Sequence, residues 1–105
     1  MIPMISPAEA QEFLKRDGVN VVGFKAPWCP QCEPQRGVVE RLIPRHEGKV
    51  DFAYIDLETH PDAQEAFDIS ALPALHIAKD GAVQERLSGF TKAPLLNQKL
   101  QAICG

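Results

Sequence analysis

The apolar positions of this chain fall into runs with the character of β-strands. Residues 19–24 form a β-branched run of the kind that is buried on both faces of a sheet. Residues 50–57 predict a second buried strand, and residues 1–5 predict a short leading one. Two further runs, 74–78 and 82–87, flank Lys79-Asp80-Gly81. Because Asp-Gly between apolar runs is typical of a hairpin, this last pair should be antiparallel.

Between these runs, apolar residues recur at helical spacing. Ser6-Pro7-Ala8-Glu9 is a capping box with proline in the first turn, and it predicts a helix that ends at Gly18. A longer helix is expected over about residues 30–46 and a short one over 62–67. Thr91 is expected to cap a last helix. In the long helix the predicted buried stripe is Val38, Val39, Leu42 and Ile43, and the predicted exposed residues are Arg36, Glu40, Arg41 and Arg45.

The order of these elements, (β)αβαβαββα, predicts an α/β fold. We expect a central mixed β-sheet whose central strands are parallel, with helices on both faces. The length of 105 residues fits a single domain over residues 1–105.

Composition and charge narrow the range of functions. The chain is 45% hydrophobic and carries a net charge of −3 without any basic block, which argues against nucleic acid and anionic membranes as partners. No apolar stretch approaches the ~18 residues that span a bilayer. Residues 1–5 do not resemble the start of a secretory signal, so the cytoplasm is the expected location.

The chemistry of the chain centres on Trp28-Cys29-Pro30-Gln31-Cys32, which follows a predicted strand and opens a predicted helix. Two cysteines at this spacing can close a small disulfide across one turn. The first would lie near outward-pointing backbone N–H groups, which stabilise a thiolate, so we expect a depressed pKa for Cys29. A thiolate at neutral pH can attack another disulfide.

A structural pair or half of a metal site is the alternative for these two cysteines. Zinc would need two further ligands, and the remaining candidates are scattered along the sequence: Cys104, His46, His60 and His76. His46 is expected near a helix C-terminus, and Cys104 is expected to be a frayed terminal thiol. An odd number of cysteines also argues against a secreted disulfide framework. Redox chemistry without a metal is therefore the leading hypothesis.

Together with the order of elements, the segment from Phe24 to Cys32 resembles the thioredoxin family, and the similarity covers almost the whole chain. Tyr54-Ile55-Asp56 is similar to the end of the family's central strand. Leu72-Pro73 is similar to its proline opposite the active site, and Lys79-Asp80-Gly81 to its hairpin. Ser88-Gly89-Phe90 is similar to the glycine segment before its last helix.

The resemblance implies a role for each matching residue. Cys29 would attack a substrate disulfide, and Cys32, more buried, would resolve the mixed disulfide. Trp28 would shape the rim of the site, and a cis Pro73 would turn the backbone of Leu72 toward an extended substrate. Gly89 would lie beside the same substrate strand.

The resemblance also implies which residues adjust the redox potential. Pro30 removes one backbone N–H near Cys29, and Gln31 adds no charge, so a reductant or a moderate potential is expected. Lys25 stands where the family usually has an aromatic residue, and it would favour a thiolate if close. Glu33 would oppose the thiolate.

Other positions depart from the family's pattern. Gly23 replaces a buried aspartate that helps to deprotonate the second cysteine, and Phe52 replaces the lysine that pairs with it. We therefore expect Gly23→Asp to speed the resolving step. Ala74 replaces the usual threonine after the cis proline, and Pro34 and Gly37 are weak points in the active-site helix.

The leading functional hypothesis is a thiol–disulfide oxidoreductase, a dithiol carrier that reduces protein disulfides through Cys29 and Cys32. The resemblance implies no bound cofactor, a monomer, and an NADPH-dependent flavin reductase as electron donor. One alternative is a glutaredoxin-like, glutathione-coupled reductant, because that family favours Cys-Pro-x-Cys. A second alternative is a non-catalytic binding module, because the usual acid is missing at Gly23.

Overall fold

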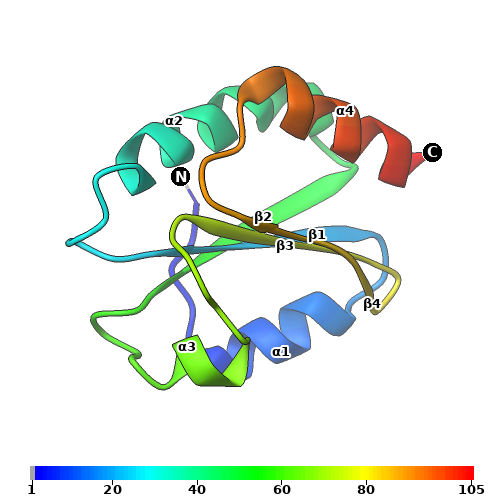
Figure 1. The fold of residues 1–105 in the computed structure, drawn as a ribbon. Helices are drawn as coiled ribbons and strands as arrows, with labels where there is room; N and C mark the ends of the chain where they lie inside the picture. Colours follow the sequence, from blue (N-terminus) through cyan, green and yellow to red (C-terminus); the bar gives the residue numbers. More distant parts are fainter. Residues whose placement is uncertain (1) are drawn as a thin grey trace.

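A computed structural model describes residues 2–105 and shows a four-stranded sheet with helices against both of its faces (Figure 1). The elements along the chain are α1 (Pro7–Lys15), β1 (Val19–Lys25), α2 (Cys32–Leu42), the 3-10 helix η1 (Pro44–His46), β2 (Val50–Asp56), α3 (Ala63–Ala66), β3 (Ala74–Lys79), β4 (Ala82–Ser88) and α4 (Ala93–Cys104). The predicted α/β fold, with its mixed sheet between two helical layers, is confirmed.

The strands lie in the order β2-β1-β3-β4. β1 is parallel to β2, whereas β1 with β3 and β3 with β4 are antiparallel. The expectation of parallel central strands is therefore wrong, because the central pair β1–β3 is antiparallel. The chain leaves β2 through α3 and a segment that ends at Pro73, and it then enters β3 in the opposite direction. The hairpin at Asp80-Gly81 is confirmed.

The predicted leading strand is reduced to a single bridge between Met4 and Tyr54. Tyr54 donates its N–H to the Pro3 carbonyl at 2.9 Å, and its own carbonyl accepts from Ile5 at 2.8 Å. Pairing stops there, because Pro3 has no N–H to donate and Ser6 already caps α1. Met1, which the prediction included, lies outside the described residues.

Each face of the sheet carries its own apolar cluster. In Figure 1, α2 and α4 cover one face, and α1 and α3 cover the other. The first cluster includes Val21, Val39, Phe52, Tyr54, Leu75, Ile77, Leu96 and Leu100. The second includes Ala10, Val22, Phe24, Ile55, Ala63, Ile69 and Ala78. Because successive strand residues point to opposite faces, each central strand contributes to both clusters.

The long helix predicted over residues 30–46 is shorter in the structure. α2 begins at Cys32 and ends at Leu42, and η1 follows as a separate turn. Pro44 explains the break, since it has no N–H for the carbonyl four residues earlier and its ring crowds that carbonyl. His46 is the last residue of η1, so it lies at a helix end as predicted. It is buried, with Nε2 2.8 Å from Oδ1 of Asn97.

The start and the end of the last helix also differ from the prediction. α4 begins at Ala93, with Lys92 as N-cap, so Thr91 is not the cap. At the other end α4 continues through Cys104, which is half-buried and packed against the first cluster rather than frayed. The capping box of α1 is confirmed, with Glu9 N–H donating to Oγ of Ser6 at 3.2 Å. Across residues 2–105, no helix has the length and apolar character needed to cross a membrane.

Candidate redox site

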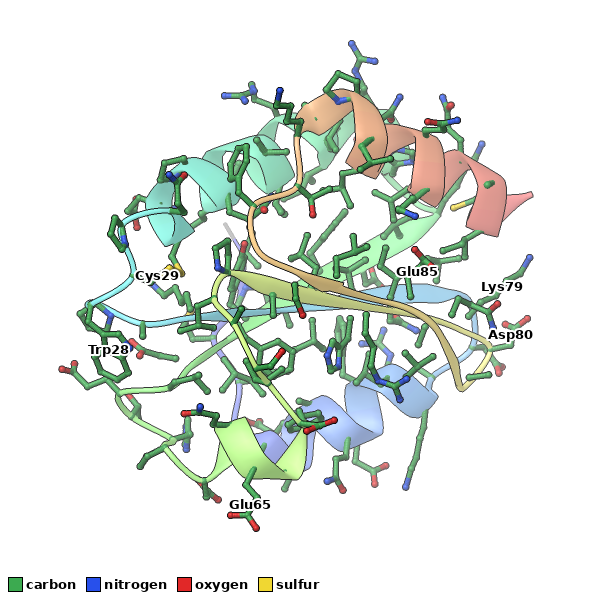
Figure 2. The ribbon with its side chains drawn as sticks, in the orientation of Figure 1. Trp28, Cys29, Glu65, Lys79, Asp80 and Glu85 are labelled. Carbon is green, nitrogen blue, oxygen red and sulfur yellow. A yellow bond between two sulfur atoms is a disulfide. The ribbon has the colours of Figure 1, made fainter. Side chains whose placement is uncertain are left out.

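The chain leaves β1 in a tight turn that presents the two cysteines at the start of α2. The Cys29 N–H donates to the Ala26 carbonyl at 3.1 Å, and the Cys29 carbonyl accepts from the Cys32 N–H at 3.3 Å. A disulfide joins Cys29 and Cys32, whose Cα atoms are 5.5 Å apart. Figure 2 shows Trp28 and Cys29 at the end of the sheet that is opposite Lys79 and Asp80.

The two cysteines differ in their access to solvent. Cys29 is half-buried in the loop, whereas Cys32 is 4% exposed as the first residue of α2. Trp28 beside them is 63% exposed, which is unusual for a large aromatic side chain. An incoming thiol or disulfide can therefore reach Cys29 but not Cys32.

A pocket of about 310 Å³ opens beside Cys29. Its lining includes Trp28, Pro30 and Leu72, which the sequence had singled out. The sequence had not identified Leu57, Gln64, Ile69, Ser70 and Ala71, which complete the lining. These residues come from the segments after β2 and around α3, so only the folded chain brings them to the cysteines.

Pro73 and Gly89 lie side by side next to the sheet. The Leu72–Pro73 peptide bond is cis, as expected. The Gly89 N–H donates to the Pro73 carbonyl at 2.8 Å, and the neighbouring Ala74 pairs with Ser88. Gly89 has φ of 81°, a conformation that favours glycine. The structure therefore brings together the two segments that the sequence had named separately.

The charges near the disulfide are partly paired. Arg36 contacts Oε2 of Glu33 at 2.9 Å and Oε2 of Glu40 at 3.0 Å. The hydrogen bond from Arg36 is the main cause that lowers the pKa of Glu33, and the charge of Lys25 contributes in the same direction. The negative charge of Glu33 is thus balanced by the positive charge of Arg36. Lys25, the last residue of β1, also acts electrostatically on Glu33. Gln31 is exposed and is the N-cap of α2 without a side-chain bond.

The position of Gly23 is filled by a residue from the adjacent strand. Gly23 pairs with Tyr54, and a Cβ at residue 23 would lie 2.6 Å from Cζ of that ring and closer still to Cε1. Phe52, two residues earlier on β2, is buried in the same cluster. This packing opposes the expectation that Gly23→Asp alone would speed the resolving step, since the new side chain must first displace the tyrosine.

One polar feature near the site was not predicted from the sequence. Gln35 on α2 is completely buried and forms two hydrogen bonds with the backbone of Thr91. Its Nε2 donates to the Thr91 carbonyl at 3.1 Å, and its Oε1 accepts from the Thr91 N–H at 2.7 Å. Glutamine on the helix face that also carries Val38, Val39 and Leu42 was the available signal. Within residues 2–105, no group of three or more His, Cys, Asp or Glu side chains could hold a metal ion.

Comparisons with known proteins agree with this geometry. The family model described as Thioredoxin matches residues 2–102. A thioredoxin of Staphylococcus saprophyticus is 32% identical over 75 residues, which are 71% of this chain and 72% of the relative. A thioredoxin of Staphylococcus aureus strain N315 is 33% identical over 73 residues, 70% of each chain.

Solved structures with the same fold cover nearly the whole chain. A chloroplastic thioredoxin z superimposes with a TM-score of 0.87 at 25% identity, covering 97% of this chain and 93% of its own. The oxidised mitochondrial thioredoxin 3 of Saccharomyces cerevisiae gives 0.85 at 22% identity, with 96% and 94% covered.

Proposed function

The chain belongs to the thioredoxin family and is a thiol–disulfide oxidoreductase, and we propose that Cys29 attacks the substrate disulfide while Cys32 resolves the product. The observation that carries this assignment is the contrast between a half-buried Cys29 and a buried Cys32 within one disulfide. The reductase function is preferred over a glutaredoxin-like reductant and over a non-catalytic binding module.

Reduction of a substrate takes two exchange steps. In the first, the Cys29 thiolate attacks one sulfur of the substrate disulfide, forming a mixed disulfide and releasing the other sulfur as a thiolate that takes a proton from water. In the second, Cys32 loses its proton and attacks Sγ of Cys29. The Cys29–Cys32 bond forms, the bond to the substrate breaks, and the second substrate sulfur leaves as a thiolate. Two electrons have then passed from the protein to the substrate.

The surroundings of Cys29 support a binding role for four residues. Trp28 and Leu72 line the pocket beside the cysteine, and Pro73, which follows Leu72 in the chain, accepts a backbone hydrogen bond from Gly89. We assign these residues to contacts with an extended substrate segment. Pro30, Gln31 and Lys25 are assigned to adjusting the redox potential. Pro30 and Gln31 lie between the two cysteines in the chain, and Lys25 lies four residues before Cys29.

The physiological setting follows from this chemistry. The proposed substrates are protein disulfides, and the proposed electron donor is an NADPH-dependent thioredoxin reductase. Because the electrons are carried by the two cysteines, the single domain of residues 1–105 needs no resident cofactor. A monomer suits a carrier that must present the same cysteine to donor and acceptor. The free thiol of Cys104, in a chain that also carries a redox-active pair, suits a reducing compartment, for which we propose the cytoplasm.

A single-turnover experiment tests the assignment of the two cysteines. Reduced protein is mixed with a disulfide-linked protein substrate, and free thiols are counted over time. Cys29→Ser should abolish reduction, whereas Cys32→Ser should attack once and remain trapped as a mixed disulfide. Trapping by Cys29→Ser instead would reverse the roles. A reduction potential near the ~−270 mV of thioredoxins would support a protein reductant, and one of about −200 to −230 mV would favour coupling to glutathione.

A further inference from the structure

Tyr54 on β2 occupies the space above Gly23 on β1, where a side chain of residue 23 would otherwise lie. β1 and β2 are parallel, with Gly23 directly beside Tyr54. The aromatic ring covers Gly23 so closely that Cδ1 lies 2.8 Å from the place of a Cβ at that residue. The absence of a side chain on β1 therefore admits the phenol of β2, which is 2% exposed.

The hydroxyl of this tyrosine is buried and has no hydrogen-bond partner among residues 2–105. A phenol normally finds a partner when it is buried, and an unpaired hydroxyl destabilises the fold that contains it. Tyr54→Phe would remove this cost without changing the shape of the ring. A buried polar atom that packing does not require is therefore a candidate for a chemical role.

The hydroxyl lies on the side of the sheet where Cys32 is buried. Tyr54 belongs to the apolar cluster beneath α2 and α4. Burial is the main cause that raises the pKa of the phenol; of the charges on α2, that of Arg36 lowers it and those of Glu40 and Glu33 raise it. Cys32 is one helical turn before Arg36, so the two residues share a side of α2.

Two other buried polar side chains beneath α2 and α4 already have partners. Gln35 is bonded to the backbone of Thr91, and His46 to Asn97. Neither is free to serve the cysteine. Within the described part of the chain, Tyr54 is the buried hydroxyl on this face that stays available when the disulfide opens.

We propose that the Tyr54 hydroxyl donates a hydrogen bond to Sγ of Cys32 once the disulfide is reduced, and thereby stabilises the Cys32 thiolate for the resolving step. This role rests on the proposed function of Cys32. No proton moves from tyrosine in the step: Cys32 releases its proton to water, the thiolate attacks Sγ of Cys29, and the substrate sulfur leaves with the electron pair of the broken bond. Because the phenol stays neutral, it remains a donor throughout.

Tyr54→Phe tests the proposal, since the ring keeps its shape and loses the hydroxyl alone. In the reduced variant we expect the pKa of Cys32 to rise by about one unit, because a lost charge-assisted hydrogen bond is worth at least that much. At pH 7 the resolving step should slow about tenfold, in line with one unit of pKa. The attack by Cys29 should stay within about twofold, because no bond to Cys29 is involved.

The pH dependence separates this role from a structural one. The charged groups that act electrostatically on the phenol are Arg36, Glu33 and Glu40 on α2. They stay charged across the alkaline range in which a thiol titrates. Raising the pH should therefore restore the resolving rate of Tyr54→Phe toward that of the original protein, which a packing defect would not do.

A matched control removes the hydroxyl of Thr91, the residue whose backbone is bonded to Gln35 of α2. Thr91→Val keeps the two backbone bonds to Gln35 and should leave the pKa of Cys32 and the resolving rate unchanged. An unchanged Cys32 pKa and resolving rate in Tyr54→Phe would overturn the proposal. A protein that reduces no disulfide before any substitution would instead overturn the proposed function itself.

Discussion

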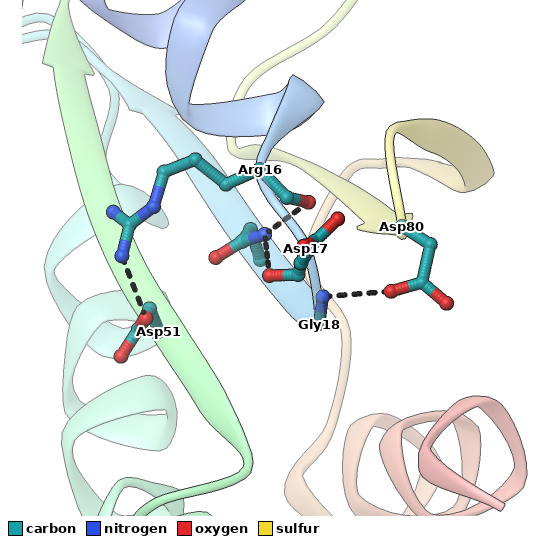
Figure 3. A network of polar contacts seen from close by, with 6 residues as sticks. Arg16, Asp17, Gly18, Asp51 and Asp80 are labelled. Carbon is teal, nitrogen blue, oxygen red and sulfur yellow. Dashed lines mark hydrogen bonds and ion pairs between the residues drawn. The ribbon is translucent and has the colours of Figure 1, made fainter.

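At its N-terminal end β1 starts inside a network of polar bonds, whereas at its C-terminal end it leads into the cysteine turn beside an unpaired buried hydroxyl. Figure 3 shows the first end. Nδ2 of Asn20 donates to the carbonyls of Arg16 and Asp17 at 3.2 and 3.3 Å. The Gly18 N–H donates to Oδ1 of Asp80 at 2.8 Å, and the Asp80 N–H returns a bond to the Gly18 carbonyl at 2.9 Å. This end ties α1, β1 and the β3–β4 hairpin together.

The opposite end contains the reactive groups. On the face of the sheet that α2 covers, the Tyr54 hydroxyl has no partner among the described residues, and Trp28 beside Cys29 is largely exposed. The network at the far end holds the strand in register, although Oδ1 of Asn20 within it is buried without a partner among the described residues. Substitutions at the active end should therefore change both stability and rate, and those at the bonded end stability alone.

The largest effect should come from Gly23→Asp at the active end. The new side chain has no room beside the Tyr54 ring, and its carboxylate would be buried. Overpacking and burial of a charge together should reduce the free energy of unfolding by about 3 kcal/mol or more. Urea denaturation of the oxidised protein measures this loss.

A double variant sharpens the interpretation of that loss. Tyr54→Ala makes room for the acid in the double variant Gly23→Asp/Tyr54→Ala. Its loss in free energy of unfolding should therefore be smaller, by at least about 1 kcal/mol, than the sum of the losses in the two single variants. Additive losses would show that the ring and the new side chain do not compete for one space.

Between the two ends, His76 on β3 should make stability depend on pH. Burial, with a smaller contribution from Arg86, lowers the pKa of His76 from 6.5 to about 4. Between these values the unfolded chain binds the proton and the folded one does not, so stability is full above pH 6.5 and falls as the pH drops toward 4. The loss should reach about 3 kcal/mol below pH 4.

The control for this pH effect is His76→Leu, which fills the same site beside Phe24 without a titrating group. Carboxylates also titrate near pH 4, so the informative quantity is the difference between the two proteins in free energy of unfolding. If that difference stays constant from pH 7 to pH 4, His76 does not remain neutral in the folded protein.

The contrast between the two ends also explains what could be predicted from sequence. Local patterns were sufficient for the elements: the capping box, the Asp-Gly hairpin and the cysteine turn are all present. The end of α2 was missed because the predicted helix was carried through Pro44 to His46, whereas the proline ends α2 and begins a separate 3-10 turn. Gly23 was seen only as a missing acid, since the ring that fills its space comes from Tyr54, which is distant in sequence. Contacts between residues that are far apart in the chain leave no periodic pattern in the sequence.

Near the active end, Gln35→Leu should have an intermediate effect. Leucine retains the volume but leaves the Thr91 N–H and carbonyl without their partners, at a cost of about 2 kcal/mol. The segment after Gly89 would also lose its attachment to α2, so KM for a protein disulfide should rise more than kcat falls. Chemical denaturation and steady-state kinetics measure both effects. A fall in kcat with an unchanged KM would show that Gln35 does not position this segment for substrate binding.

The smallest effects should come from the bonded end, where stability and activity separate. Asp80→Ala removes the 2.8 Å bond to the Gly18 N–H and should cost about 1 kcal/mol. Arg16→Ala removes an ion pair of 3.2 Å to Asp51, but both side chains are more than half exposed, so the cost should stay within about 0.5 kcal/mol. Both variants should reduce disulfides at the original rate, because neither bond lies near Cys29. A slower resolving step in Asp80→Ala would show that the network also positions the active end, and the division of roles along β1 would then be wrong.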